Sequence, residues 1–165
     1  MSVKFRRFAG LAAGAVLVIA GITGCGGDGG EDESSALTQE EFVAQANALC
    51  AEFRTAAEDS TAEYDEAQQA GDIEAAADAY AKAGDQMSVM ISGIDGLGAP
   101  EGDEGTIDEI VSLGGQMVDN TAAGAEALRT EDLEAVGETN TEADKLRSQF
   151  DAAAGEYGLT GCVST

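Results

Sequence analysis

The sequence predicts an all-α fold, an up-down-up-down antiparallel four-helix bundle over residues 38–165 that follows a signal peptide (1–24) and a disordered tether (25–37). The composition is rich in Ala, Asp and Glu with a single Pro, which favours helix over sheet. Apolar residues recur three or four positions apart along four stretches, as on one face of a helix. The connections between these stretches are short, so consecutive helices must run antiparallel.

The first helical stretch begins and ends with strong local signals. Thr38 can cap its N-terminus while Glu41 reaches back to the cap, and Leu37 and Phe42 flank the pair as a hydrophobic staple. Gly71 is a typical residue just past a helix end. The expected apolar face consists of positions 42, 46, 49, 53, 57, 60 and 64.

The second and third stretches are separated by a loop that contains three Gly and the only Pro, G-L-G-A-P-E-G at residues 96–102. The second begins at Asp72, a good N-cap residue. The third begins between Asp103 and Thr106, where Thr106 and Glu109 are expected to form another capping box. The expected faces are Ile73, Ala77, Tyr80, Gly84, Met87, Ile91 and Ile94, and then Ile107, Ile110, Gly114, Met117, Thr121, Ala125 and Leu128.

The fourth stretch is expected to be capped by Thr130 and to end at Gly158. Because the helix faces hold many Ala and Gly residues, the helices can pack closely but bury little area per residue. Gly84, Gly114 and Gly124 lie inside helices, where Gly costs about 1 kcal/mol relative to Ala. A core that buries so little apolar area should need a covalent cross-link. The fourth face is Leu133, Val136, Asn140, Ala143, Leu146, Phe150, Ala153 and Tyr157.

The formal net charge of −24 is distributed unevenly along the chain. Residues 1–24 hold three bases and no acid, which leaves five bases against 32 acids and a net charge of −27 elsewhere. Such a surface is repelled by nucleic-acid phosphates and by anionic lipid head groups, so neither is an expected partner of the folded part. The charge fits a solvated coat, or a partner that is a cation or a basic protein surface.

The N-terminus has the organisation of a secretory signal peptide. Lys4, Arg6 and Arg7 form a basic start, and residues 8–21 form an apolar stretch. This stretch is shorter than the about 20 apolar residues that a membrane-spanning helix needs. We therefore expect the protein to be exported and the segment to be removed.

The apolar stretch is followed by Ile22-Thr23-Gly24-Cys25. An aliphatic residue, two small residues and Cys resemble the lipobox of bacterial lipoproteins. The resemblance implies cleavage before Cys25 and attachment of a diacylglyceryl group to its thiol. The alternative is an ordinary signal peptide or an uncleaved anchor with Cys25 as a free thiol. An exposed thiol on an exported protein would be a reactivity liability, which argues against that alternative.

Lipidation at Cys25 would place the domain at the outer face of the cytoplasmic membrane. Two or more acyl chains anchor a protein stably, at about 0.8 kcal/mol per buried methylene. The segment that follows, G-G-D-G-G-E-D-E-S-S-A at residues 26–36, is Gly-rich, acidic and free of large apolar groups. We expect it to be a disordered tether with an average reach of about 20 Å.

The remaining cysteines, Cys50 and Cys162, form an even pair, which in an exported protein indicates a disulfide. In an up-down-up-down bundle the fourth helix ends beside the start of the first, and Gly158 and Gly161 would let the tail turn back. The bond would close a loop of about 110 residues, worth about 4–5 kcal/mol on the chain-entropy argument. A redox-active pair is the alternative, but the chain has no C-x-x-C motif to support it.

A broader resemblance follows from both ends of the chain. The lipobox, the acidic tether, L-T-Q-E-E-F-V-A-Q-A-N-A-L-C-A at residues 37–51 and Y-G-L-T-G-C at residues 157–162 look like a group of small exported helical lipoproteins. These are common in high-GC Gram-positive bacteria and mostly lack an assigned function. The resemblance implies a helical bundle with the terminal Cys pair bonded, and it implies no activity.

The residue types present argue against catalysis and against a metal site. The chain contains no His, the commonest general base and transition-metal ligand. No stretch matches an EF-hand or a phosphate-binding loop. We expect no enzyme activity, no metal and no cofactor; weak surface calcium binding by residues 101–104 or 28–33 is the one alternative.

Two functions fit these observations. The first is a lipid-anchored, non-enzymatic envelope interaction or accessory module. The second is a binding protein for a small apolar or cationic ligand within the bundle. Asn140 and Thr121 predict either a polar pair that sets helix register or a polar contact in a pocket. Met87, Met90 and Met117 predict plain core or an adaptable apolar site, and a cavity lined by them and by Asn140 would favour the second function.

The lipobox assignment makes the first testable prediction. A Cys25→Ser variant should accumulate as unprocessed precursor and lose metabolic labelling with a fatty acid, because the acyl acceptor is gone. Labelling is followed by gel electrophoresis of cells grown with a tagged fatty acid. Continued labelling of the variant would refute the assignment.

Overall fold

The computed structural model describes residues 37–164. These residues belong to one compact unit with its own hydrophobic core. The predicted signal peptide, Cys25 and all of the tether except Leu37 lie outside the described residues.

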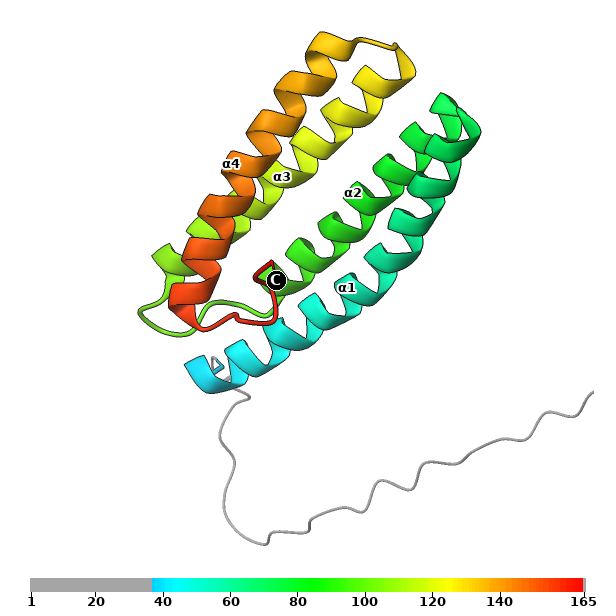
Figure 1. Cartoon of the computed structure of the whole chain (residues 1–165). Coiled ribbons are helices and arrows are strands. Elements are labelled where there is room, and N and C mark those ends of the chain that lie inside the picture. Colours follow the sequence, from blue (N-terminus) through cyan, green and yellow to red (C-terminus); the bar gives the residue numbers. More distant parts are fainter. Residues whose placement is uncertain (1–36, 165) are drawn as a thin grey trace, which may run out of the picture. The chain divides into compact units, whose positions relative to one another are not determined.

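Four helices, connected by short loops, run alternately up and down (Figure 1). No strand occurs within residues 37–164, so the predicted all-α four-helix bundle is confirmed. None of these helices is long and apolar enough to cross a membrane. The elements are α1 (Gln39–Ala70), α2 (Ile73–Gly96), α3 (Glu104–Arg129) and α4 (Leu133–Tyr157).

The predicted capping box at the start of α1 is confirmed. The Glu41 backbone N–H donates to Thr38 Oγ1 at 3.3 Å, and the Thr38 backbone N–H donates to Glu41 Oε2 at 3.0 Å. The hydrogen bonds from the Thr38 hydroxyl and then from its N–H lower the pKa of Glu41. The stabilisation by Glu41 is therefore present at neutral pH and is lost only as the pH falls through this lowered pKa.

The predicted caps of α3 and α4 were wrong. Thr106 lies inside the first turn of α3, and Asp103 occupies the N-cap position. Thr130 ends α3 instead of starting α4, since its hydroxyl donates to the Glu126 carbonyl at 2.9 Å. Asp132 caps α4 by accepting from the Ala135 N–H at 3.1 Å. Thr130 was misassigned because the turn between α3 and α4 contains Glu131 at φ 54°, with no Gly in the sequence to mark it.

The large apolar residues gather in one half of the bundle, toward the α2–α3 loop and the C-terminal segment. Phe42, Ile94, Ile110 and Leu159 are fully buried there. The other half is filled mainly by Ala. The buried alanines of that half are Ala67, Ala76, Ala77, Ala79, Ala125 and Ala127.

Two large apolar residues of the expected faces are exposed. Ile73 is 42% exposed and Leu133 is 83% exposed. Both are the first residues of their helices, at the end of the bundle where the α1–α2 and α3–α4 turns lie (Figure 1).

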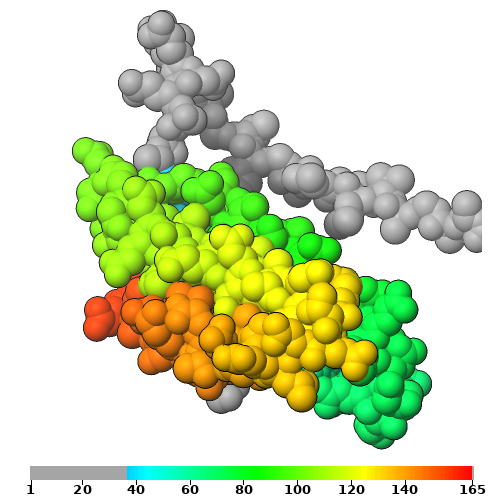
Figure 2. Space-filling model, turned by 90° about the horizontal axis from the view of Figure 1, so that it is seen from above, coloured from blue at the N-terminus to red at the C-terminus, as the bar shows by residue number. Residues whose placement is uncertain are grey.

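The helices pack in chain order, α1 on α2, α2 on α3 and α3 on α4. Figure 2 shows α3 and α4 side by side along the face that it draws. Within residues 37–164, no Cα atom of α1 comes within 8 Å of α4. These two helices meet through side chains near one end, where the Phe42 and Tyr157 rings lie edge to face with their centroids 5.9 Å apart. The bundle is therefore open along the side between its first and last helices.

The three interior glycines that the sequence marked as costly allow α2 and α3 to approach each other. A Cβ on Gly114 would overlap the Ile91 side chain, and one on Gly124 would lie 2.8 Å from Tyr80 Cε1. A Cβ on Gly84 would lie 3.1 Å from Thr121 Cγ2. The helix propensity lost at these positions is exchanged for close packing.

Neighbouring glycines of α3 provide a matched test. A Cβ on Gly115 meets no atom within 4 Å, so Gly115→Ala should stabilise the domain by up to about 1 kcal/mol through helix propensity. Gly114→Ala must displace buried Ile91, whose χ1 is stiff, so it should be about 1–3 kcal/mol less stable than Gly115→Ala. Urea unfolding of the two variants measures the difference. Equal midpoints would show that α2 and α3 are not in close contact at Gly114.

Candidate binding cleft between the first and last helices

The C-terminal segment after α4 crosses the open side of the bundle toward α1 (Figure 1). Gly158 has φ 100°, and the Leu159 N–H donates to the Ala154 carbonyl at 2.8 Å. This left-handed helix ending turns the chain back and places Leu159 in the core with no exposed surface.

The predicted disulfide joins this segment to α1. Cys50 and Cys162 are bonded, with their Cα atoms 5.0 Å apart, and they are 112 positions apart in the sequence. Cys50 is buried among the large apolar residues of the core. The bond therefore links the last residues of the chain to the first helix across the open side.

Asn47 also holds the segment to α1, although the sequence offered no signal for it. Its side-chain oxygen accepts from the Gly161 N–H at 2.6 Å, and its amide donates to the Gly158 carbonyl at 3.4 Å. A Cβ on Gly161 would lie 2.7 Å from the same oxygen, so Gly is required where the chain passes over Asn47. The expectation that these glycines let the tail turn back toward Cys50 is met by this contact.

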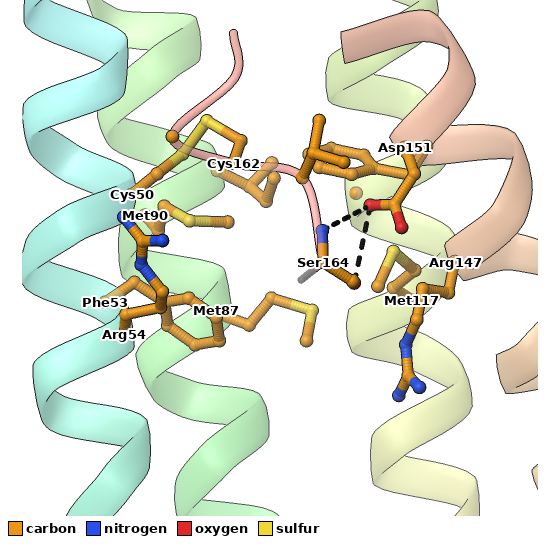
Figure 3. A pocket seen from close by; sticks show the side chains of 15 residues that line it. Cys50, Phe53, Arg54, Met87, Met90, Met117, Arg147, Asp151, Cys162 and Ser164 are labelled. Carbon is orange, nitrogen blue, oxygen red and sulfur yellow. Dashed lines mark hydrogen bonds between the residues drawn. A yellow bond between two sulfur atoms is a disulfide. The ribbon is translucent and has the colours of Figure 1, made fainter. Parts of the chain in front are cut away.

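The far end of the segment is tied to α4. The Ser164 N–H donates to Asp151 Oδ1 at 3.2 Å, and the Ser164 hydroxyl lies 3.5 Å from the same oxygen (Figure 3). The segment is thus held on both sides of the opening, by α1 and by α4. It forms one wall of a cleft that continues along the open side.

This cleft has a volume of about 280 Å³ and a mainly apolar lining. Met87 and Met117, from α2 and α3, point toward each other across it (Figure 3). Met90 lines it as well, so the three methionines marked in the sequence come together here. The other apolar or small lining residues are Cys50, Phe53, Ile91, Gly114, Phe150, Gly161, Cys162 and Val163.

Two arginines from opposite helices border the cleft. Arg54 extends from α1 and Arg147 from α4, and both are exposed (Figure 3). No acidic group of residues 37–164 lies within 4.0 Å of either guanidinium. The other three bases of this part of the chain are paired, Lys82 with Glu63, Arg129 with Asp78 and Lys145 with Glu142.

A more open depression continues from the cleft between the same two helices, and Arg147 lines both. Asn140 lies here and is exposed, outside the methionine-lined cleft. Thr121 donates to the Met117 carbonyl within α3 at 2.8 Å, so the expected polar pair of Asn140 and Thr121 does not form. Tyr80 lines the depression, and burial raises the pKa of its hydroxyl.

A hydrogen bond outside the cleft joins the start of α3 to the end of α4. The Tyr157 hydroxyl donates to Asp103 Oδ2 at 2.6 Å, and burial, followed by this hydrogen bond, raises the pKa of Tyr157 well above its usual range. Within residues 37–164 no cluster of three or more Cys, Asp or Glu residues is arranged to hold a metal ion. What the cleft offers is apolar surface and two guanidinium groups.

Comparison of the chain with family models, with curated proteins and with solved structures finds no match. The chemistry of the cleft is therefore the basis for a functional assignment.

The bridge across the open side makes a stability prediction. A Cys50→Ala/Cys162→Ala variant should lose up to about 4–5 kcal/mol of unfolding free energy, because the unfolded chain is no longer constrained across 112 positions. Asn47→Ala, which leaves the bond intact, should lose about 1–3 kcal/mol. Guanidinium unfolding, with the reduced native sequence as control, measures both. An unfolding midpoint unchanged by loss of the bond would contradict a stabilising role.

Proposed function

We propose that this chain is a lipid-anchored, extracytoplasmic, non-enzymatic protein that binds a small apolar ligand in the cleft between α1 and α4. The observation that carries the proposal is a mainly apolar cleft of about 280 Å³ lined by three methionines and two phenylalanines. Small-molecule sites are typically concave and apolar with a few polar groups at defined places, and they begin at about 300 Å³. A volume at this lower limit suits a ligand with a short or medium-length chain.

The side chains of the cleft support ligand binding over plain core packing. Met87 and Met117 pack against the core, but both are only partly buried, and they point toward each other across the cleft. Met has three rotatable bonds and a polarizable sulfur, so a Met-lined surface adapts to ligands of different shape. The rigid disulfide-bonded segment on one side gives this adaptable surface a fixed wall.

The location in this proposal comes from the N-terminal residues. The resemblance of Ile22-Thr23-Gly24-Cys25 to a lipobox supports a lipid on Cys25 as the link to the membrane. The acidic domain would be repelled from anionic head groups, so the tether would hold it in the aqueous layer outside the membrane. The cleft would then remain accessible to ligands released from, or delivered to, the envelope.

A second candidate is an interaction module for a basic envelope protein. The observation in its favour is the charge, since residues 37–164 hold five bases against 28 acids, four of the 32 acids lying in residues 1–36. A surface of this kind attracts basic partners over long range. It does not account for the apolar cleft, and for that reason ligand binding is the preferred function.

A fluorescent apolar probe tests the proposed function. Residues 34–165, the compact unit, should bind neutral N-phenyl-1-naphthylamine with enhanced emission. Met117→Trp should weaken binding by about tenfold or more, because the indole ring fills the space that the probe needs. Leu133→Trp is the matched control, since Leu133 is 83% exposed and lines no part of the cleft.

Circular dichroism and cooperative unfolding establish that each variant is folded; if Met117→Trp is not, Met87→Phe replaces it. Absence of probe binding to the native sequence, or equal binding by the cleft variant and the control, would contradict the proposal.

A further inference from the structure

We infer that the cleft is selective for a single-chain amphiphile with an anionic head group, of the medium-chain carboxylate class, whose head group is bound by Arg54 and Arg147. This inference rests on the proposed function and names the chemical class of the ligand. It departs from a cationic ligand, which the strongly acidic composition alone had suggested.

The local charge of the cleft is opposite to that of the domain. Residues 37–164 hold five bases against 28 acids, a net charge of −23. The cleft is lined by two of those five bases and by only one of the acids, Asp151. Its lining therefore carries a net charge of +1, and the two positive charges lie on both of the helices that border it.

The single acid of the lining is committed to another contact. Asp151 Oδ1 accepts from the Ser164 N–H, and this bond holds the end of the C-terminal segment. Asp151 is four residues after Arg147 on α4, a spacing at which an ion pair is often found. No such pair forms within 4.0 Å, and Arg147 is left with its donors directed elsewhere, as in Figure 3.

The two arginines retain donors for an incoming anion. Each guanidinium carries five N–H donors, and no acidic group of the described chain lies within 4.0 Å of either one. Guanidinium groups bind carboxylates through paired, charge-assisted hydrogen bonds. A cation in the same cleft would be repelled by both arginines, so the charge favours an anion.

The position of the arginines matches the shape of an amphiphile. Arg54 and Arg147 extend from opposite sides of the methionine-lined space (Figure 3), and both residues are exposed. Arg side chains commonly lay their apolar stems along apolar surface and keep their charge in water. An alkyl chain inside the cleft would therefore have its head group at the level of the guanidinium groups.

The negative charge of the rest of the domain does not oppose this binding strongly. At physiological ionic strength the Debye length is about 8 Å, so exposed acids at greater distance are largely screened. The guanidinium groups at the cleft act over contact distances, where screening is weak. Lower salt should strengthen both the attraction and the long-range repulsion, so the tests below are made at one fixed, physiological ionic strength.

The test compares three ligands of equal chain length. Decanoate, decan-1-ol and decyltrimethylammonium are used to displace N-phenyl-1-naphthylamine from residues 34–165. The inference predicts that decanoate displaces the probe at about three- to tenfold lower concentration than decan-1-ol, since exposed charge pairs contribute modestly. The cationic ligand should be the weakest of the three. Equal displacement by decanoate and decan-1-ol would overturn the inference.

Variants that remove one or both charges then test whether Arg54 and Arg147 cause the preference for decanoate. Arg54→Gln and Arg147→Gln should each weaken the binding of decanoate and leave the binding of decan-1-ol unchanged. The double variant should bind the two ligands with equal affinity. Arg129→Gln is the matched control, because Arg129 is paired with Asp78 and does not line the cleft. It should retain the full preference for decanoate. A double variant that keeps the preference would overturn the assignment to these two residues.

The outcomes separate this inference from the proposed function. If decan-1-ol and decanoate both displace the probe but equally well, the cleft binds apolar ligands and only the anion selectivity is wrong. If neither ligand displaces it, the proposed function fails. Light scattering is measured in parallel: a dimer that the arginine variants dissociate would make a second copy of the chain the occupant of the cleft and would overturn the inference.

Discussion

The bond between Cys50 and Cys162 is the constraint on which the rest of the structure depends. The first and last helices meet only through side chains near one end, so the usual closure of a four-helix bundle by helix packing along its length is missing. The C-terminal segment replaces that contact. It leaves α4 through a left-handed turn at Gly158, places Leu159 in the core, passes over Asn47 and is bonded to α1. Closure by a thin segment covers only part of the open side and leaves a cleft beside it.

The composition of the core explains why such a bond is needed. Large apolar residues fill one half of the bundle, and Ala fills most of the other, where each residue buries little area. Gly84, Gly114 and Gly124 let α2 and α3 approach closely, which improves packing but costs helix propensity. The disulfide joins the half with the larger side chains, where Cys50 is itself a core residue. Export to an oxidising compartment, which the N-terminal residues predict, is the condition under which such a bond persists.

Charge and apolar surface are separated in a way that connects structure to the proposed function. Acids cover the domain, and three of its five bases are used in ion pairs on the surface. The remaining two, Arg54 and Arg147, border the methionine-lined cleft. An acidic coat would keep the domain soluble and away from anionic membranes, and the arginines would give the cleft a local preference of opposite sign. The proposed lipid on Cys25 would keep the domain near its ligands despite this repulsion.

Local signals in the sequence determined the helices, and the tertiary structure decided the site. Thr38 with Glu41, Asp72, Gly71 and Gly158 act through bonds to residues a few positions away, so helix boundaries and chain direction followed from them. The pairing of Cys50 with Cys162 followed from that topology. Thr130 was predicted to start α4 but ends α3, because the chain turns at Glu131, where the sequence has no Gly to indicate a turn. The gap between α1 and α4, the Asn47 contact and the meeting of Arg54 with Arg147 at one cleft could not be read from periodicity. They depend on distances between residues about 90 to 110 positions apart, and periodicity reports which side of a helix is apolar but not how far away its neighbour lies.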